Sequence, residues 1–232
     1  MIVDVEATRA HRTDEVNATR TMLDRTEATT GLKPDRLIGD TAYGSAAMLG
    51  WLVEEKAIEP HVPVWDKSER SDGTFSRSDF ESREDDDAYR CPAGKALRCE
   101  RRNFKVPRSH VTKADTILYR ASERDCKRCP MKAQCCPNMP MRKIIRSIHE
   151  RARDVARKIA TTAQYLQSRC ERKKVEMLFA HLKRILRLDR LRLRVLSGAR
   201  DEFLLAATAQ NLRRMAKRSM PVVQNEMKGL PA

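Results

Sequence analysis

Three charged residues share one side of a helical stretch late in the chain. They are Arg172, Glu176 and Lys183, within the sequence ERKKVEMLFAHLKRI. At 100° per residue they fall at about 0°, 40° and 20° on a helical wheel, beside an apolar stripe. This pattern suits a metal-binding carboxylate flanked by cations that hold phosphate oxygens or orient the carboxylate itself. Ordinary surface ion pairing, worth about 0.2–0.5 kcal/mol per pair, gives the same spacing.

A second candidate carboxylate, Asp40, closes the short apolar segment RLIGD. In a parallel α/β sheet, ligand sites gather beyond the carboxyl ends of the strands, where Asp40 is expected. Such a carboxylate binds Mg²⁺, although it also serves as a cap for the next turn. Asp40 and Glu176 together are typical of two-metal phosphoryl-transfer sites. Those sites normally use a third carboxylate, which the sequence does not supply; Asp4 lies in the middle of a predicted strand.

Seven cysteines form the third candidate site, and four of them lie between residues 126 and 136. Cys126, Cys129 and Cys135 have the spacing of tetrahedral zinc ligands, and Cys91 is the best fourth ligand. Cys99, Cys136 and His110 remain alternatives for that place. The other reading is a set of small buried thiols, which we expect for Cys170.

The charge of the chain favours a polyanion as partner. The 232 residues include 47 Lys and Arg against 32 Asp and Glu, a net charge of +15. Residues 171–218 alone hold fourteen bases against five acids, and "RILRLDRLRLRVL" alternates bases with leucines. Aromatic residues make up only 5%, which argues against a single-strand binder that stacks bases. We find no membrane-spanning run and no signal peptide, and we expect a soluble cytoplasmic protein.

The N-terminal part predicts an α/β unit that would position Asp40. Short β-branched or apolar runs predict strands at residues 1–8, 36–40 and 57–65. Between them, helices are expected from about residue 13 to Gly31 and from Ser45 to about Lys56. Alternating strands and helices indicate a parallel sheet.

The remainder of the chain divides into an excursion and a helical part. Residues 66–90 carry nine acids against five bases and few large apolar side chains, so we predict a loop. Residues 90–136 suit short hairpins and knuckle turns that hold the cysteines. From about Ser147 the pattern is helical, with one long or broken helix to about Leu188 and another from Gly198 to Lys217.

Several motifs together resemble bacterial insertion-sequence transposases with a DDE domain, in their C-terminal part. GDTAYGS is similar to the segment that carries the second catalytic Asp, here Asp40. RKKVEMLFAHLK is similar to the Y-x2-R-x3-E-x6-K signature, which falls on Arg172, Glu176 and Lys183, with Arg169 in the place of the Tyr. AATAQNLRRMAKR is similar to the closing helix of that family, and CPAGKAL and CKRCPMKAQC to the cysteine-bearing insertion of one of its branches.

The resemblance implies an incomplete ribonuclease H-like α/β fold with a small cysteine-rich, zinc-binding insertion. The expected parts are a partial core (1–65), an acidic loop plus insertion (66–146), C-terminal helices completing the core (147–218) and a tail (219–232). In this reading residues 1–8 are the third strand of the fold. The chain is then a truncated transposase that lacks the first catalytic Asp and is inactive alone.

The function expected from this resemblance is DNA strand cleavage and transfer. Mg²⁺ or Mn²⁺ would be bound by Asp40 and Glu176, and structural Zn²⁺ by Cys91, Cys126, Cys129 and Cys135. The partners would be double-stranded DNA at the element's ends and at the target, with a homodimer when complete, at the bacterial nucleoid. Two alternatives are a zinc-stabilised DNA-binding module without catalysis and a fragment that does not fold stably.

Overall fold

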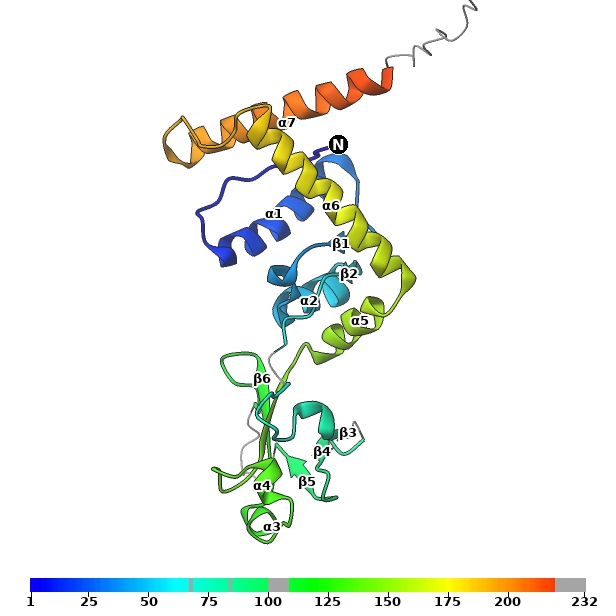
Figure 1. The fold of residues 1–232 in the computed structure, drawn as a ribbon, viewed down its shortest axis with the longest axis vertical. Coiled ribbons are helices and arrows are strands. Elements are labelled where there is room, and N and C mark those ends of the chain that lie inside the picture. The colour runs from blue at the N-terminus through cyan, green and yellow to red at the C-terminus, as the bar shows by residue number, and fades with distance from the viewer. Residues whose placement is uncertain (67–68, 84, 100–108, 220–232) are drawn as a thin grey trace, which may run out of the picture. The chain divides into compact units, whose positions relative to one another are not determined.

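The computed structural model describes residues 1–66, 69–83, 85–99 and 109–219, which fall into two compact units (Figure 1). Unit 1 comprises residues 1–34 and 167–232, and unit 2 comprises residues 35–166. Within the described ranges, every strand belongs to unit 2, and the secondary structure of unit 1 is helical. The predicted mixed α/β class is confirmed.

The first part of unit 2 is a parallel strand–helix–strand unit, as predicted. Strands β1 (Arg36–Ile38) and β2 (Glu59–His61) pair in parallel. They are joined by the 3₁₀ turn η1 (Thr41–Gly44), the helix α2 (Ala46–Gly50) and its π-helical continuation η2 (Trp51–Glu55). Ser45 starts α2, because its side chain accepts a hydrogen bond from the Met48 N–H at 3.3 Å.

Helix α5 (Glu150–Ala160) covers α2 and β2. Ala152 and Ala156 lie one turn apart on α5 and are fully buried with Leu49 and Val62. The lack of a side chain at Gly50 on α2 allows a close approach to the start of α5, since a Cβ added there would lie 2.2 Å from His149 Nδ1. The apolar interior of this part of unit 2 therefore depends on residues from both ends of the sequence of the unit.

The second part of unit 2 is a five-stranded antiparallel sheet in the order β3-β4-β5-β6-β7. Its elements are the turn η3 (Arg77–Asp79), β3 (Glu81–Arg83), β4 (Ala88–Arg90), β5 (Ala96–Arg98), β6 (Thr116–Arg120), α3 (Glu123–Lys127), α4 (Lys132–Cys135) and β7 (Lys143–Ser147). The prediction of a loop over residues 66–90 is wrong at β3 and β4. Two isolated aromatic residues, Phe80 directly before β3 and Tyr89 in β4, are buried in a core and hold these strands there, although β3 itself is exposed.

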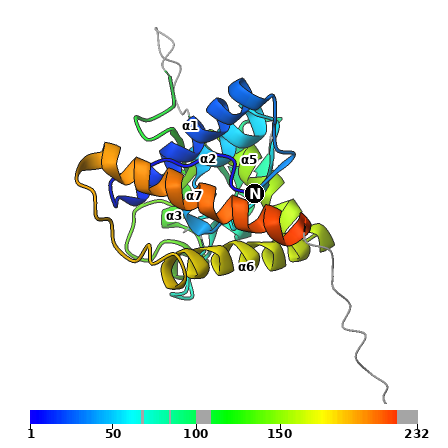
Figure 2. The same cartoon turned by 90° about the horizontal axis from the view of Figure 1, so that it is seen from above.

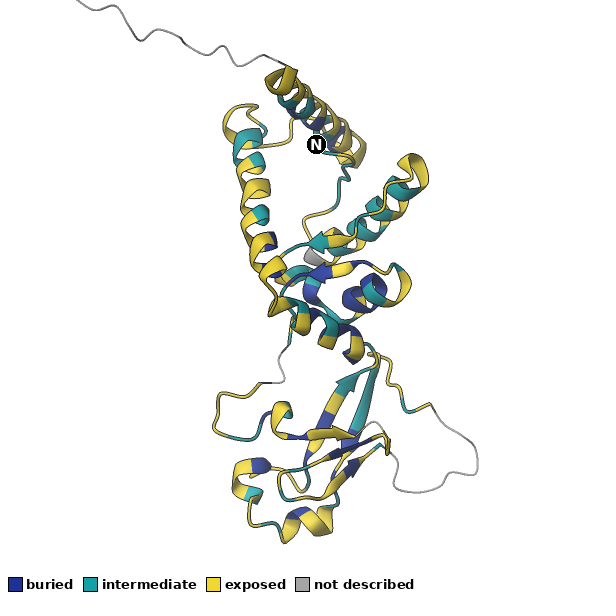
Figure 3. Ribbon diagram, turned by 90° about the vertical axis from the view of Figure 1, so that its right-hand side faces the viewer, coloured by how far each residue is buried: buried dark blue, intermediate teal, exposed yellow. Residues whose placement is uncertain are grey.

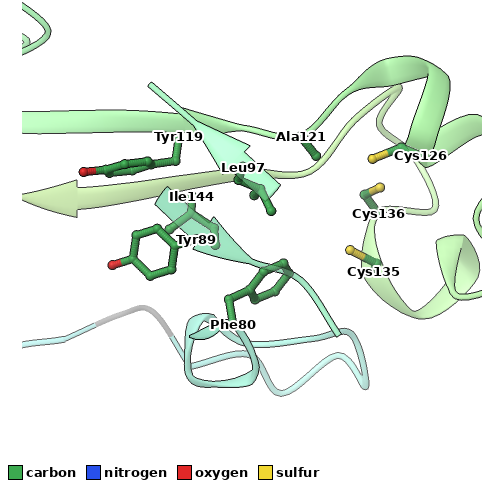
Figure 4. Close-up of a cluster of buried hydrophobic side chains, with 9 residues drawn as sticks. All are labelled: Phe80, Tyr89, Leu97, Tyr119, Ala121, Cys126, Cys135, Cys136 and Ile144. Carbon is green, nitrogen blue, oxygen red and sulfur yellow. The ribbon is translucent and has the colours of Figure 1, made fainter. Parts of the chain in front are cut away.

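One face of this sheet builds a compact apolar cluster that ends at three cysteines (Figure 4). Tyr89 and Tyr119 meet edge to face, with ring centroids 5.1 Å apart. The Tyr119 hydroxyl donates a hydrogen bond to Asp87 Oδ1 at 2.5 Å. Burial together with this carboxylate raises the pKa of Tyr119 well above its ordinary value.

A buried ionic network joins the two parts of unit 2. Glu150, which is 4% exposed, pairs with Arg77 at 2.6 Å, Arg157 at 2.9 Å and Arg153 at 3.1 Å. Asp66 pairs with the same three arginines. These charges fix the point at which the chain leaves the parallel unit, through Asp66, and the point at which it returns, through Glu150.

Unit 1 contains the helices α1 (Arg12–Thr30) and α7 (Val195–Ser219), and all but the first four residues of α6 (Ala163–Arg184). Helix α1 ends as predicted at Gly31, whose φ of 68° is the left-handed conformation that glycine favours. Helices α6 and α7 are joined by the loop at residues 185–194 (Figure 2), and His181 Nδ1 lies 2.9 Å from Gln210 Oε1 across them. The helices expected after Ser147 are thus present, with a break at Thr161 and Thr162.

The predicted strand at residues 1–8 is not formed. In the part of the chain that the structure describes, no strand pairs with this segment. Side chains bind it instead: Asn211 exchanges two hydrogen bonds with the backbone of Ile2, and Arg25 pairs with Asp4 and Glu6 at 2.9 and 2.7 Å. The β-branched composition of residues 1–8 therefore predicted a strand, but a strand forms only where another strand pairs with it, and none of the described strands does.

Candidate functional site

Asp40 lies where the sequence placed it, directly beyond the carboxyl end of β1. It is the N-cap of η1, and its Oδ1 accepts a hydrogen bond from the Ala42 N–H at 2.7 Å. The residue is exposed to solvent. A capping carboxylate in this position still presents lone pairs of both oxygens to water, so its chemistry suits a hard divalent cation.

The three charged residues of the helical signature all lie on α6. Arg172 Nε is 3.6 Å from Glu176 Oε1, an ion pair between residues four apart. The Glu176 side chain is 64% exposed, and Lys183 is exposed in the last turn of the helix. The helix therefore displays an open carboxylate between two cations, with the pairing that a surface helix also shows.

The structure brings Arg172 and Glu176 together and assigns Asp40 to the other unit, since residue 40 belongs to unit 2 and residue 176 to unit 1. Within the described ranges, no three Asp, Glu, His or Cys side chains are arranged to hold a metal ion. The meeting of Asp40 with Glu176 over a metal ion stays a prediction.

Five cysteines line one small cavity of about 30 Å³ at the end of the antiparallel sheet. They are the four predicted zinc ligands and Cys136: Cys91, Cys126, Cys129, Cys135 and Cys136. Figure 4 shows three of them, Cys126, Cys135 and Cys136, which are buried together at the end of the apolar cluster. The "cysteine cavity" below means this space and its lining. Its zinc ion stays a prediction.

Two thiols of the cysteine cavity are shifted toward their neutral form. Burial raises the pKa of the Cys126 thiol above its ordinary value and raises the pKa of Cys135 to about 12. The other candidate ligands lie elsewhere: the cavity lining includes neither Cys99 nor His110, and the Cys99 thiol donates to Asp87 at 3.5 Å. Cys170, expected to be buried, is exposed on α6.

Sequence reasoning missed three buried charged residues, Arg142, Glu150 and Arg153. Arg142 is 6% exposed and lines the cysteine cavity. Glu150 anchors the ionic network described above. No local pattern distinguishes such residues from the many surface bases and acids of this chain, because tertiary packing alone decides which of them are buried.

The basic residues of the C-terminal stretch are largely exposed on unit 1, where Figure 3 shows most of α6 and α7 as exposed surface. On α6 they include Arg169, Lys173, Lys174 and Lys183, and on α7 they include Arg200, Arg213, Lys217 and Arg218. Many exposed positive charges on neighbouring helices are complementary to the negatively charged phosphate backbone of a nucleic acid. No helix in the described ranges has the length and apolar character needed to cross a bilayer.

Comparison with known families decides the class of the protein. The family model of the transposase DDE domain matches residues 90–216, more than half of the chain. The chain belongs to the transposase DDE domain family. The matched residues include Arg172, Glu176, Lys183 and all seven cysteines of this transposase-family chain, and they exclude Asp40. No curated protein and no solved structure matches it.

Proposed function

We propose that this chain supplies part of the catalytic domain of an insertion-sequence transposase, which cleaves DNA strands and transfers them in a metal-dependent reaction. The observation that carries the proposal is the transposase DDE domain match over residues 90–216, which contains the Arg172–Glu176–Lys183 pattern. Asp40, open to solvent beyond a parallel strand, is the second acidic group. A ribonuclease H-like arrangement would bring both carboxylates to one sheet edge.

Each residue has a distinct role in this proposal. Asp40 and Glu176 would hold Mg²⁺ or Mn²⁺, since both are exposed carboxylates and hard cations prefer oxygen ligands. When bound, such ions activate the attacking oxygen and stabilise the leaving oxygen of a phosphodiester. Arg172 would hold the Glu176 carboxylate in place, and Lys183 would bind a phosphate oxygen.

Double-stranded DNA is the proposed partner, at the element's ends and at the target. The exposed Lys and Arg side chains of α6 and α7 would bind the DNA phosphates, and these contacts do not depend on the base sequence. The cysteine-bearing segment takes no part in the chemistry; its thiols would hold a structural zinc ion. We expect the affinity of the chain for duplex DNA to fall steeply with salt, as counterion release requires.

The decisive experiment separates the capping role of Asp40 from a metal-binding role. Asparagine is as good an N-cap as aspartate, so Asp40→Asn keeps the acceptor for the Ala42 N–H but removes the charge. We expect an active family member with this change at the matching position to lose strand cleavage and to retain DNA binding.

Glu176→Gln should have the same effect, while Glu171→Gln, five residues earlier on α6, serves as the matched control. Cleavage by Asp40→Asn and Glu176→Gln at the rate of the parent would refute the catalytic assignment. That result would instead favour a DNA-binding module without chemistry.

A further inference from the structure

The cysteine cavity gathers thiols from three separate segments. Cys91 follows β4, Cys126 and Cys129 flank the end of α3, and Cys135 and Cys136 end α4. Cys136 is buried in the same cluster as Cys126 and Cys135 and lines the same cavity. It is therefore a candidate ligand as much as Cys135 is.

The backbone around Cys91 is shaped to support a thiolate. Gly94 has a φ of 75°, and its N–H donates to the Cys91 carbonyl at 2.7 Å. The next N–H, that of Lys95, donates to Cys91 Sγ at 3.3 Å. A hydrogen bond donated to sulfur stabilises the charged form of the side chain, which is the form that binds metals.

Arg142 is a buried cation on the wall of the same cavity. It is 6% exposed, donates to the carbonyls of Cys135 and Phe75 at 3.0 and 2.7 Å, and lies 5.0 Å from the centre of the Phe80 ring. In the part of the chain that the structure describes, no carboxylate lies within 4.0 Å of its guanidinium, and its Nε has no hydrogen-bond partner. The Asp72 carboxylate acts on this charge only from beyond ion-pair distance, so the guanidinium is buried without a close counter-charge, which is unfavourable.

We infer that Arg142 is the counter-charge of a zinc ion bound in the cysteine cavity by Cys91, Cys126, Cys129 and one of the adjacent Cys135 and Cys136. Four thiolates around one Zn²⁺ carry a net charge of −2, and the guanidinium offsets one of these two negative charges. On binding, the four thiols would release four protons to water, and their sulfur atoms would have to move, because no three of these thiols, all of which the structure describes, are arranged to hold a metal ion. The inference rests on the zinc part of the proposed function and is independent of strand cleavage.

The first test measures the metal content of the full chain, purified without added metal, by mass spectrometry. We expect about one zinc per chain. Cys126→Ser, Cys129→Ser and the double change Cys135→Ser with Cys136→Ser should lose it. Cys99→Ser and Cys170→Ser, whose thiols lie outside the cavity, should retain it. A wild-type chain without zinc, or one that contains iron in its place, would overturn the inference.

The second test addresses Arg142 by chelator competition. Arg142→Met should weaken zinc binding at least tenfold, whereas Arg142→Lys, which keeps the charge, should stay within about threefold of the wild type. Equal affinity in the Met and Lys variants would exclude the counter-charge role. If the Met variant does not fold, Arg142→Gln, which removes the charge but keeps a hydrogen-bond donor, takes its place with the same expected loss of at least tenfold. Zinc content should be unchanged in Asp40→Asn, so the failure of one proposal is distinguishable from that of the other.

Discussion

Removal of one buried charge, by Glu150→Gln, should destabilise unit 2 while leaving the shape of the side chain intact. The Glu150 carboxylate is 4% exposed and accepts from Arg77, Arg153 and Arg157 at 2.6 to 3.1 Å. Glutamine has nearly the same volume and keeps one oxygen acceptor. The change therefore isolates the negative charge that neutralises three buried or half-buried guanidinium groups.

The magnitude follows from what remains after the change. Breaking a buried ion pair by removing one partner costs about 3–5 kcal/mol, because the other charge is left uncompensated. Here Asp66, 20% exposed at its side chain, still pairs with the same three arginines. We therefore expect the lower part of that range or slightly less, about 2–3 kcal/mol in the free energy of unfolding.

Tryptophan fluorescence provides the assay. The chain has two tryptophans, Trp51 and Trp65, and both belong to unit 2, so urea titration of their emission reports the unfolding of this unit. Asp154→Asn is the matched control. The Asp154 side chain is 53% exposed and, among the described residues, pairs only with Arg157, so its loss should cost less than about 1 kcal/mol.

A cost for Glu150→Gln that does not exceed the cost for Asp154→Asn would refute this reasoning. It would mean that the three arginines are solvated in solution or are compensated by Asp66 alone. An unchanged slope of the unfolding free energy against urea is needed for this comparison, because a changed slope would indicate that the cooperative unit itself has changed.

Three further predictions follow from the same structure. Burial opposes ionisation of Glu150, but its arginine partners outweigh burial and lower its pKa below the ordinary value of 4.5. The stability that the ionised Glu150 gives to unit 2 should be complete above about pH 5 and lost as pH falls through the lowered pKa. An acid titration of tryptophan emission should show this loss in the parent and not in Glu150→Gln. Gly44→Ala should destabilise unit 2 by about 3 kcal/mol in urea titration, because the added Cβ would lie 1.9 Å from the backbone oxygen of Pro63. Arg25→Ala removes the bonds to Asp4 and Glu6, so amide hydrogen exchange in residues 2–8 should become faster, with exchange in unit 2 unchanged.

The elements that sequence patterns predicted correctly are those with local causes. The Ser45 side chain starts α2, Gly31 ends α1, and apolar periodicity marks the helices after residue 147. The parallel pair β1–β2 could also be predicted, because a strand, a capped helix and a second strand follow one another within a short segment.

The errors have tertiary causes. Residues 1–8 have the composition of a strand but no neighbouring strand in the described residues, and β3 and β4 form in an acidic segment because Phe80 and Tyr89 reach a core built by later strands. For the candidate site, cysteine spacing predicted which thiols line one cavity, while Arg142 beside them could not be predicted from spacing. The relation of Asp40 to Glu176 depends on two distant segments, and it remains a prediction.

The charged residues of this transposase-family chain fall into two groups, buried charges in unit 2 and exposed basic residues in unit 1. In unit 2, Glu150 and Arg142 are buried, so their environment must compensate each charge, and a change at either residue appears first as lost stability or lost metal. In unit 1, the Lys and Arg side chains of α6 and α7 are exposed and can bind phosphates with little effect on the free energy of unfolding. Because surface charges contribute little to stability, a charge-removing change such as Lys183→Met should alter DNA affinity without altering unfolding. Stability and DNA binding can therefore be perturbed independently, which is the condition for assigning roles to Asp40 and Glu176 by mutation.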